Sequence, residues 1–149
     1  MKVGVQVGEG QPLSWDRWRH IVAMTERLGF HSLFRSDHYW NGVQKDSIDV
    51  FLSHVATGLE STQIRFGTLV TPVTFREPVN VGRAAQQLDA LSNGRFVLGL
   101  GVGWYELEHE VYGLGYPPLA ERFDRLGEAI ELMKVLWYST DGRYDGKYY

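Results

Sequence analysis

The chain has 149 residues, a net charge of -3, no cysteine, 44% hydrophobic residues and 22% charged residues. These values predict one globular domain, exclude disulfides and thiolate metal sites, and argue against nucleic-acid binding, which needs a basic patch. No apolar run approaches the ~20 residues of a membrane span, and the first residues show no signal peptide, so we expect a cytoplasmic protein without a membrane partner.

Strands and helices are expected to alternate along the chain. The first elements are a strand over Val3–Val7, a helix from its cap Ser14 to about Leu28 that Gly29 closes, a strand over His31–Ser36, and a helix over Ile48–Leu59 capped by Asp46 or Ser47. The next are a strand over Ile64–Val70, a helix over Val79–Leu91 ended by residues 92–94, a strand over Arg95–Trp104, a loop or short helix over Leu107–Tyr116, and a helix opened by Pro117 and Pro118. The tail Asp141–Tyr149 has two Asp-Gly turn signals and looks like the start of a hairpin.

Apolar residues recur in each expected helix at a spacing of three and four, which predicts one buried face per helix. The four sets are Trp18, Ile21, Val22, Thr25 and Leu28; Ile48, Phe51, Leu52, Val55 and Leu59; Val81, Ala84, Ala85, Leu88 and Leu91; and Leu119, Phe123, Leu126, Ile130, Met133 and Trp137. Three histidines, His20, His54 and His109, have no metal-site spacing and are expected at the surface. Arg122, Asp124 and Arg125 are expected to form a solvated, ion-paired helix face.

The apolar run over Arg95–Trp104 predicts a strand that is buried on both faces, because a half-buried strand would alternate. Three glycines near its end, Gly99, Gly101 and Gly103, would let the backbone pass close to a flat or charged ligand. They would equally let the strand fit a crowded sheet, so this motif alone leaves both interpretations open.

Strand and helix in steady alternation predict parallel strands joined by right-handed crossovers. Two architectures remain: an open doubly wound sheet, or one half of an eight-stranded barrel. An open sheet would bring a Gly-x-Gly-x-x-Gly turn after its first strand, whereas this chain has only Gly8 and Gly10 there. In both architectures ligands gather at the carboxyl ends of the strands, so the strand exit loops are the candidate site.

Five motifs in this order carry a resemblance that runs over essentially the whole chain: Phe34–Tyr39, Gly67–Arg76, Leu91–Arg95, Gly99–Trp104 and Glu121–Arg125. The set resembles the luciferase-like flavin oxidoreductases, and within them it is most similar to the branch that uses the deazaflavin coenzyme F420. The resemblance implies an α/β fold, a TIM (β/α)8 barrel of which this chain would hold only the first four βα units. We therefore expect a truncated chain whose open strand edges make a homo-oligomer or aggregation favourable.

Asp37 and His38 directly follow the second expected strand. The resemblance implies a cofactor-contacting acid at Asp37 and a catalytic base at His38, assisted by Asp37. A histidine suits proton transfer near neutral pH because its unperturbed pKa lies near 6.5. The alternative is that Asp37 only closes a turn and that His38 is a solvated neighbour.

The resemblance also implies that Leu69, Val70 and Thr71 pack under the flavin, with a non-prolyl cis peptide between Leu69 and Val70. An ordinary strand end before a proline is the alternative. Arg76 could serve an anionic group, or it could merely pair with Glu77.

At the end of the fourth strand, the resemblance implies that Gly103, Trp104 and Glu108 border the deazaflavin and the substrate. Some family members carry an acid at the position of Trp104, and this chain does not. Glu108 could hold a cofactor hydroxyl, act as an acid, or cap the following helical turn.

The function that the resemblance implies is hydride transfer between a small organic substrate and coenzyme F420. An FMN-dependent monooxygenase is the alternative enzyme. A catalytically inactive fragment that acts only as an assembling or binding module is the alternative outside enzymes, and no metal is expected in any of these cases.

Overall fold

A computed structural model describes residues 1–8, 13–40 and 48–149. Four parallel strands form its main sheet in the order β1-β2-β3-β5, so each strand lies beside the next along the chain. These strands are β1 (Gly4–Val7), β2 (Ser32–Arg35), β3 (Arg65–Thr68) and β5 (Phe96–Val97). Beyond the ends of β3 and β5, the short strands β4 (Thr71–Pro72) and β6 (Leu100–Gly101) pair in parallel as well. The predicted parallel sheet is therefore confirmed.

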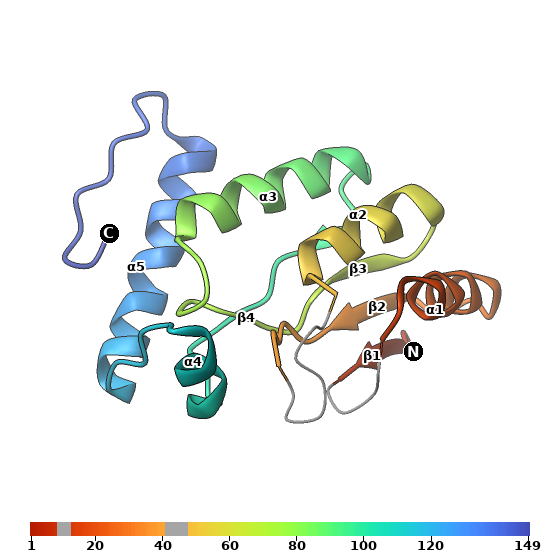
Figure 1. Cartoon of the computed structure of the whole chain (residues 1–149). Coiled ribbons are helices and arrows are strands. Elements are labelled where there is room, and N and C mark those ends of the chain that lie inside the picture. The colour runs from red at the N-terminus through yellow and green to blue at the C-terminus, as the bar shows by residue number, and fades with distance from the viewer. Residues whose placement is uncertain (9–12, 41–47) are drawn as a thin grey trace.

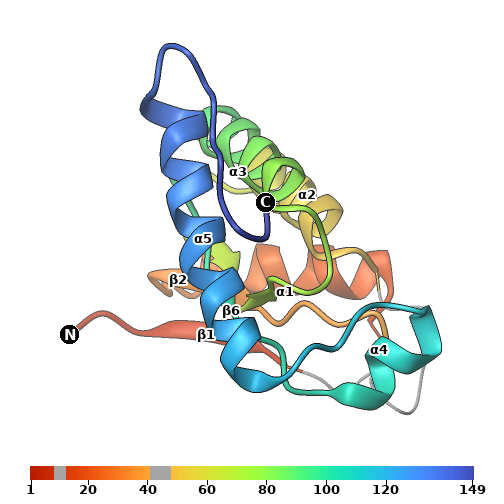
Figure 2. The ribbon, with the colours of Figure 1, turned by 90° about the vertical axis from the view of Figure 1, so that its left-hand side faces the viewer.

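The helices pack in a row, α1 on α2, α2 on α3 and α3 on α5. Their bounds are α1 (Trp15–Arg27), α2 (Val50–Glu60), α3 (Pro78–Leu91), α4 (Glu106–Tyr112) and α5 (Leu119–Tyr138). Figures 1 and 2 show the four long helices following one another along one side of the strands. A doubly wound sheet would place successive helices on both faces, so this arrangement favours the wall of a barrel. None of the helices within the described residues has the length and apolar character to span a membrane.

Helix α1 begins and ends as the sequence predicts. The hydroxyl of Ser14 accepts a hydrogen bond from the backbone N–H of Arg17 at 3.2 Å, which caps the helix. Gly29 has a φ of 73°, the left-handed conformation that commonly closes a helix. On the buried face, Trp18 and Val22 enter the core under the sheet.

Helix α2 begins later than predicted, and its N-cap is Asp49, whose carboxylate accepts from the N–H of Leu52 at 2.9 Å. Asp46 and Ser47, the predicted caps, lie outside the described residues. The predicted apolar face is only partly right: Phe51 and Ile48 lie against the core, whereas Leu52, Val55 and Leu59 are exposed. The buried face also carries several polar groups, namely Ser53, His54 and Thr57.

Ser53 and Thr57 fit the core because other buried groups form hydrogen bonds with them. The indole N–H of Trp18 donates to the Ser53 carbonyl at 2.8 Å and to the Thr57 hydroxyl at 3.2 Å. The guanidinium of Arg35 donates to the Ser53 hydroxyl at 2.9 Å. A periodicity of apolar residues cannot detect a helix face that is buried through hydrogen bonds.

His54 is a correction to the expected surface histidine, because its side chain is fully buried. Its ring lies 5.9 Å from that of Trp18 and 5.5 Å from that of Phe66, measured between centroids. Burial lowers the pKa of His54 to about 3, because the charged imidazolium would lose its hydration, and the positive charge of Arg35 adds to this.

The apolar run over Arg95–Trp104 is split into β5 and β6, and its residues from Val97 to Gly103 are only half buried. The prediction of one strand buried on both faces is therefore wrong, since β5 forms an edge of the sheet in this chain. Gly99 and Gly101 do pack tightly: a Cβ on Gly99 would lie 2.3 Å from the Thr68 carbonyl oxygen. For these two glycines the crowded-sheet interpretation is supported.

Helix α5 buries only part of the predicted face, namely Met133 and Trp137, which lie against the core. Ala129, Leu132 and Met133 are buried, whereas Leu119, Phe123 and Ile130 are exposed. The helix packs on α3, and the rest of its apolar face has no neighbour among the described residues that buries it. The tail, expected as the start of a hairpin whose partner is missing, contains no strand over 141–149 and folds back along α5 (Figure 2).

Because His54 is neutral in the folded state, we predict that stability falls as the pH falls below 6.5. The unfolded chain binds a proton near pH 6.5, and the folded chain does so only near pH 3, so stability is lost across that window. At pH 5 the loss from this group is about 2 kcal/mol of unfolding free energy.

Urea unfolding of the native chain and of His54→Leu at pH 7.5 and pH 5 measures this loss. The variant should lack this part of the pH dependence, whereas His20→Leu, at an exposed histidine, should retain it. An equal pH dependence in the native chain and in His54→Leu would contradict the prediction.

Candidate active site

The carboxyl ends of the strands bring most of the predicted site residues to one concave pocket of about 180 Å³. Loop residues after β2, β3 and β6 reach this edge of the sheet, and α4 covers it from the side. The predicted residues that line the pocket are His38, Leu69, Val70, Gly103, Trp104 and Glu108. Asp37 and Thr71 lie beneath them and are buried.

The floor of the pocket is formed where β3 ends. The peptide bond between Leu69 and Val70 is cis, which confirms the expectation at that position. The side chains of Leu69 and Val70 are 44% and 36% exposed, so they present apolar surface to the pocket. The side-chain amide of Gln6, from the end of β1, donates to the Leu69 carbonyl at 3.4 Å.

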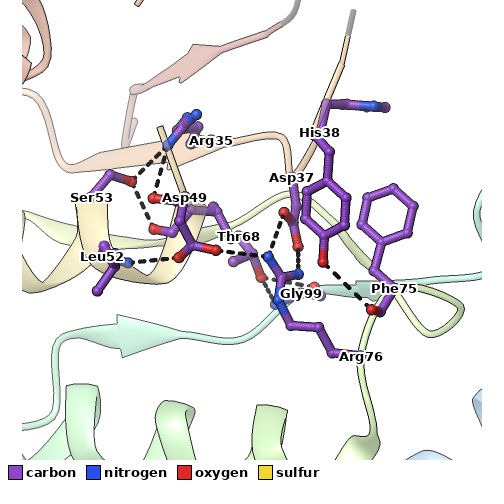
Figure 3. Close-up of polar contacts among 12 residues, drawn as sticks. Arg35, Asp37, His38, Asp49, Leu52, Ser53, Thr68, Phe75, Arg76 and Gly99 are labelled. Atoms are coloured by element: carbon purple, nitrogen blue, oxygen red, sulfur yellow. Dashed lines mark hydrogen bonds and ion pairs between the residues drawn. The ribbon is translucent and has the colours of Figure 1, made fainter. Parts of the chain in front are cut away.

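Asp37 pairs with Arg76, and Arg76 also reaches Asp49 with an Nη2–Oδ2 distance of 2.9 Å (Figure 3). The guanidinium lies over the ring of Tyr39 at 5.0 Å and over that of Phe51 at 5.2 Å. The predicted alternative for Arg76, a pair with Glu77, is therefore replaced by a pair with two other carboxylates. Because these two acids neutralise Arg76, it is poorly suited to bind an anionic ligand group.

The pKa of Asp37 lies above its ordinary value. Burial raises it because a buried carboxylate loses hydration, and the charge of Arg76 opposes that rise. Burial acts to lower the pKa of Arg76, but Asp37 outweighs it and raises the pKa above its ordinary value. The two groups therefore depend on each other for their charged forms.

His38 contacts a different carboxylate. Its Nδ1 lies 2.8 Å from Oε2 of Glu108, a fully buried residue on α4. The other oxygen of Glu108, Oε1, accepts hydrogen bonds from the backbone N–H groups of Tyr39 and Trp40, the latter at 2.8 Å. Glu108 thus ties α4 to the loop after β2, and its carboxylate does not cap the helix.

The expected assistance of His38 by Asp37 is not supported by this arrangement. Figure 3 shows the His38 side chain directed away from Asp37, whose carboxylate faces Arg76. Glu108 takes the place of that partner. Since 70 residues separate it from His38, no local pattern in the sequence indicates this pairing.

Aromatic rings form the rim of the pocket. Trp104 is 65% exposed, and its ring meets that of His38 edge-on at 6.1 Å. Tyr105 stacks on Trp104 at 5.2 Å and on Trp40 at 6.4 Å. A rim of this kind suits a flat organic ligand, because aromatic faces and edges pack well against rings.

His109 is a second correction to the expected surface histidines. It is buried beside the pocket, its Nδ1 lies 2.8 Å from the Tyr105 carbonyl, and its Nε2 lies 2.7 Å from the Thr74 hydroxyl. Because a carbonyl only accepts, Nδ1 carries the proton and Nε2 accepts from Thr74. The histidine therefore joins the turn after β4 to the start of α4.

Arg122 is a further correction, since it is buried rather than solvated. It donates to the carbonyls of Val102, Gly103 and Pro117, and thereby holds the turn at Gly103, whose φ is 77°. The expected ion pair on this helix face is found one turn away, between Arg125 and Glu121 at 2.7 Å. Arg122 therefore serves the site indirectly, by fixing the backbone before Trp104.

Other pocket residues were not predicted from the sequence, namely Gln6, Ser36, Pro72, Phe75 and His109. Gln6 sits between valines in β1, and this alternation is the signal that could have placed a polar side chain at the strand end. Within the described residues, no group of three His, Cys, Asp or Glu side chains is arranged to hold a metal ion.

A larger hollow of about 650 Å³ lies on the other side of the turn after β4. It is lined by Val73–Glu77, the loop before α5, Arg125 and Tyr149. Its two arginines are already paired, Arg76 with Asp37 and Arg125 with Glu121. The smaller pocket, which holds His38 and the cis peptide, is therefore the better candidate for chemistry.

Comparison with known proteins gives a consistent result. A family model described as luciferase-like monooxygenase matches residues 1–149. An F420-dependent glucose-6-phosphate dehydrogenase of Intrasporangium calvum is 37% identical over 129 residues, which are 83% of this chain and 39% of that protein.

Two solved structures superpose on nearly the whole chain, each with a TM-score of 0.85. One is an F420-dependent secondary alcohol dehydrogenase in complex with an F420-acetone adduct, at 22% identity, covering 99% of this chain and 46% of that one. The other is the oxygenating constituent of 3,6-diketocamphane monooxygenase from Pseudomonas putida in complex with FMN, at 19% identity, covering 100% and 42%. The chain thus spans less than half the length of these proteins, and the predicted fold class, the first four units of a TIM (β/α)8 barrel, is confirmed.

We predict that Arg76→Met destabilises the chain by about 3–5 kcal/mol, because it leaves the buried charge of Asp37 without its cation. The loss should shrink as the pH falls, since protonation of Asp37 removes the unpaired charge. Thermal unfolding between pH 4.5 and 7.5 measures both effects.

Arg125→Met is the matched control, because it removes a partly exposed ion pair within one helix. That variant should lose less than about 1 kcal/mol. Similar losses in the two variants would argue against a special role for the Asp37–Arg76 pair.

Proposed function

The chain belongs to the luciferase-like monooxygenase family, and on this premise we propose that it forms the ring-binding side of an F420-dependent oxidoreductase. The proposed reaction is hydride transfer between a small organic substrate and the deazaflavin. The observation that carries the proposal is the apolar floor at Leu69 and Val70, which faces the ring of His38 across one pocket. The relatives agree with it, since the similar glucose-6-phosphate dehydrogenase of Intrasporangium calvum is F420-dependent.

The residues of the pocket fit a flat ring. The side chains of Leu69 and Val70 offer an apolar surface, Trp104 and Tyr105 offer aromatic ones, and the turn at Gly103 brings backbone close to the opening. The volume of about 180 Å³ is below the ~300–1,000 Å³ of most ligand pockets. We therefore propose that this chain supplies one side of the site and that the other side comes from a region corresponding to the remainder of its relatives.

When bound, F420 would supply the hydride acceptor or donor, and the residues of this chain would supply the surroundings. Leu69 and Val70 would support one face of the ring and exclude water from it. His38 would accept the proton of a substrate hydroxyl during oxidation and return it during reduction. Thr71 and Asp37, beneath the floor, would hold the backbone on which the ring rests.

An FMN-dependent monooxygenase is the second candidate, because the chain superposes equally well on the FMN-bound monooxygenase of Pseudomonas putida and on the F420-dependent alcohol dehydrogenase. The pocket floor would serve either ring, because both cofactors present a flat three-ring system. The two functions differ in oxygen chemistry: a monooxygenase consumes oxygen when its flavin is reduced.

We also propose that the chain self-associates. Leu119, Phe123 and Ile130 expose apolar surface along α5, and β5 forms an edge of the sheet. Exposed apolar surface and unpaired strand edges favour association with a second polypeptide. The cytoplasmic location expected from the sequence stays a prediction.

The first test is titration of the chain with F420 and, separately, with FMN, followed by cofactor fluorescence. We expect saturable micromolar binding of F420 that is tighter than that of FMN. Val70→Asp should weaken binding at least 10-fold, about 1.4 kcal/mol, because it places a charge against the ring. Val79→Asp, at an exposed valine of α3 outside the pocket, should bind like the native chain.

Tighter binding of FMN with oxygen consumption would favour the monooxygenase. Absence of binding to either cofactor by a folded chain would overturn the proposal.

The second test is light scattering over a range of protein concentrations. We expect a mass above that of one chain, and a return towards it in a Phe123→Glu and Ile130→Glu double variant, because charges interrupt the apolar face of α5. Leu28→Glu, at an exposed leucine after α1, is the control and should not change the mass. A native chain that is monomeric at all concentrations would refute self-association.

A further inference from the structure

The carboxylate of Glu108 is fully buried and is in hydrogen-bonding contact with three groups. Oε1 accepts from the N–H groups of Tyr39 and Trp40, and Oε2 lies 2.8 Å from Nδ1 of His38. The two N–H groups belong to consecutive residues of the loop that also carries His38. The carboxylate is therefore fixed relative to the histidine backbone as well as to its ring.

The bonding partners decide the tautomer of His38. An ionised carboxylate offers only acceptors, so the Nδ1 that contacts Oε2 must carry the hydrogen. In the neutral ring, Nε2 is then the unprotonated nitrogen with its lone pair. A histidine with this tautomer accepts a proton at Nε2, and the nearby negative charge stabilises the cation that results.

We propose that Glu108 is a positioning residue that holds His38 in the tautomer with hydrogen on Nδ1. The consequence for catalysis rests on the function proposed above. During oxidation, the substrate hydroxyl gives its proton to Nε2 of His38, and the carbon that carries this hydroxyl gives a hydride to F420. The C–O single bond of the substrate thereby becomes a carbonyl. Glu108 keeps its own charge throughout and balances the positive charge on the ring.

The variant Glu108→Gln replaces one carboxylate oxygen by an amide nitrogen and preserves the size and shape of the side chain. In Glu108→Gln, the amide oxygen must remain at the Oε1 position, because two backbone N–H groups donate there. The amide nitrogen then takes the Oε2 position and donates to Nδ1 of His38. Since that Nδ1 must now accept, the hydrogen moves to Nε2, and the ring can no longer take a proton there.

Long-range 15N–1H correlation NMR of the labelled chain at pH 8.5 reads the tautomer directly, with the His38 signals assigned through His38→Gln. We expect protonated Nδ1 in the native chain and protonated Nε2 in Glu108→Gln. Glu106→Gln, at an exposed glutamate on the same helix, should keep the native tautomer. A purely structural role of Glu108 would leave the tautomer of His38 unchanged in the folded variant.

Protonated Nε2 in the native chain would overturn the proposal even if Glu108→Gln fails to fold, and so would a folded Glu108→Gln with the native tautomer.

With F420 bound, we expect the turnover of Glu108→Gln to fall at least 10-fold while cofactor affinity stays within 2-fold. Undiminished turnover in a variant with the switched tautomer would overturn the catalytic part. Absence of turnover in the native chain, with the tautomer switch intact, would contradict the proposed function and leave the positioning role supported.

Discussion

The candidate site depends on two buried carboxylates at the ends of the strands, each of which is held by groups from a different part of the chain. Asp37 is 1% exposed and Glu108 is 0% exposed, and an isolated charge at such a position would be prohibitively unstable. Arg76 neutralises the first from the loop after β4, and backbone N–H groups with His38 bind the second. Satisfying these charges fixes the loop after β2 between the loop after β4 and helix α4, so the position of His38 follows from electrostatics.

The order of the elements could be predicted from the sequence, because strand and helix signals are local. The cap at Ser14 and the closing turn at Gly29 were predicted from local signals, and the cis peptide at Leu69–Val70 was expected from the family resemblance. The gathering of His38, Val70 and Trp104 at one sheet edge was also predicted, since it follows from parallel topology.

The parts that could not be predicted are those in which burial depends on distant partners. In the sequence, Ser53, His54 and Thr57 resemble the exposed polar side of a helix. In the structure they are buried, because Trp18 and Arg35 form hydrogen bonds with them or pack on them. Arg122 and His109 likewise look solvent-exposed until the carbonyls that they bind are in place. For α5 the apolar spacing was real, and Met133 and Trp137 lie against the core as predicted. Leu119, Phe123 and Ile130 are exposed, because periodicity alone does not show which apolar positions of a helix meet a neighbour.

The row of helices α1, α2, α3 and α5 has a consequence for how the fold can be built. Each strand and each long helix packs mainly on its immediate successor along the chain, as in a short repeat array whose cooperativity comes from nearest-neighbour interfaces. The inner units, around β2 and β3, have a neighbour on both sides, and the outer ones have only one. Folding is thus expected to spread outward from the middle of the chain, with the first and last units forming late and opening early.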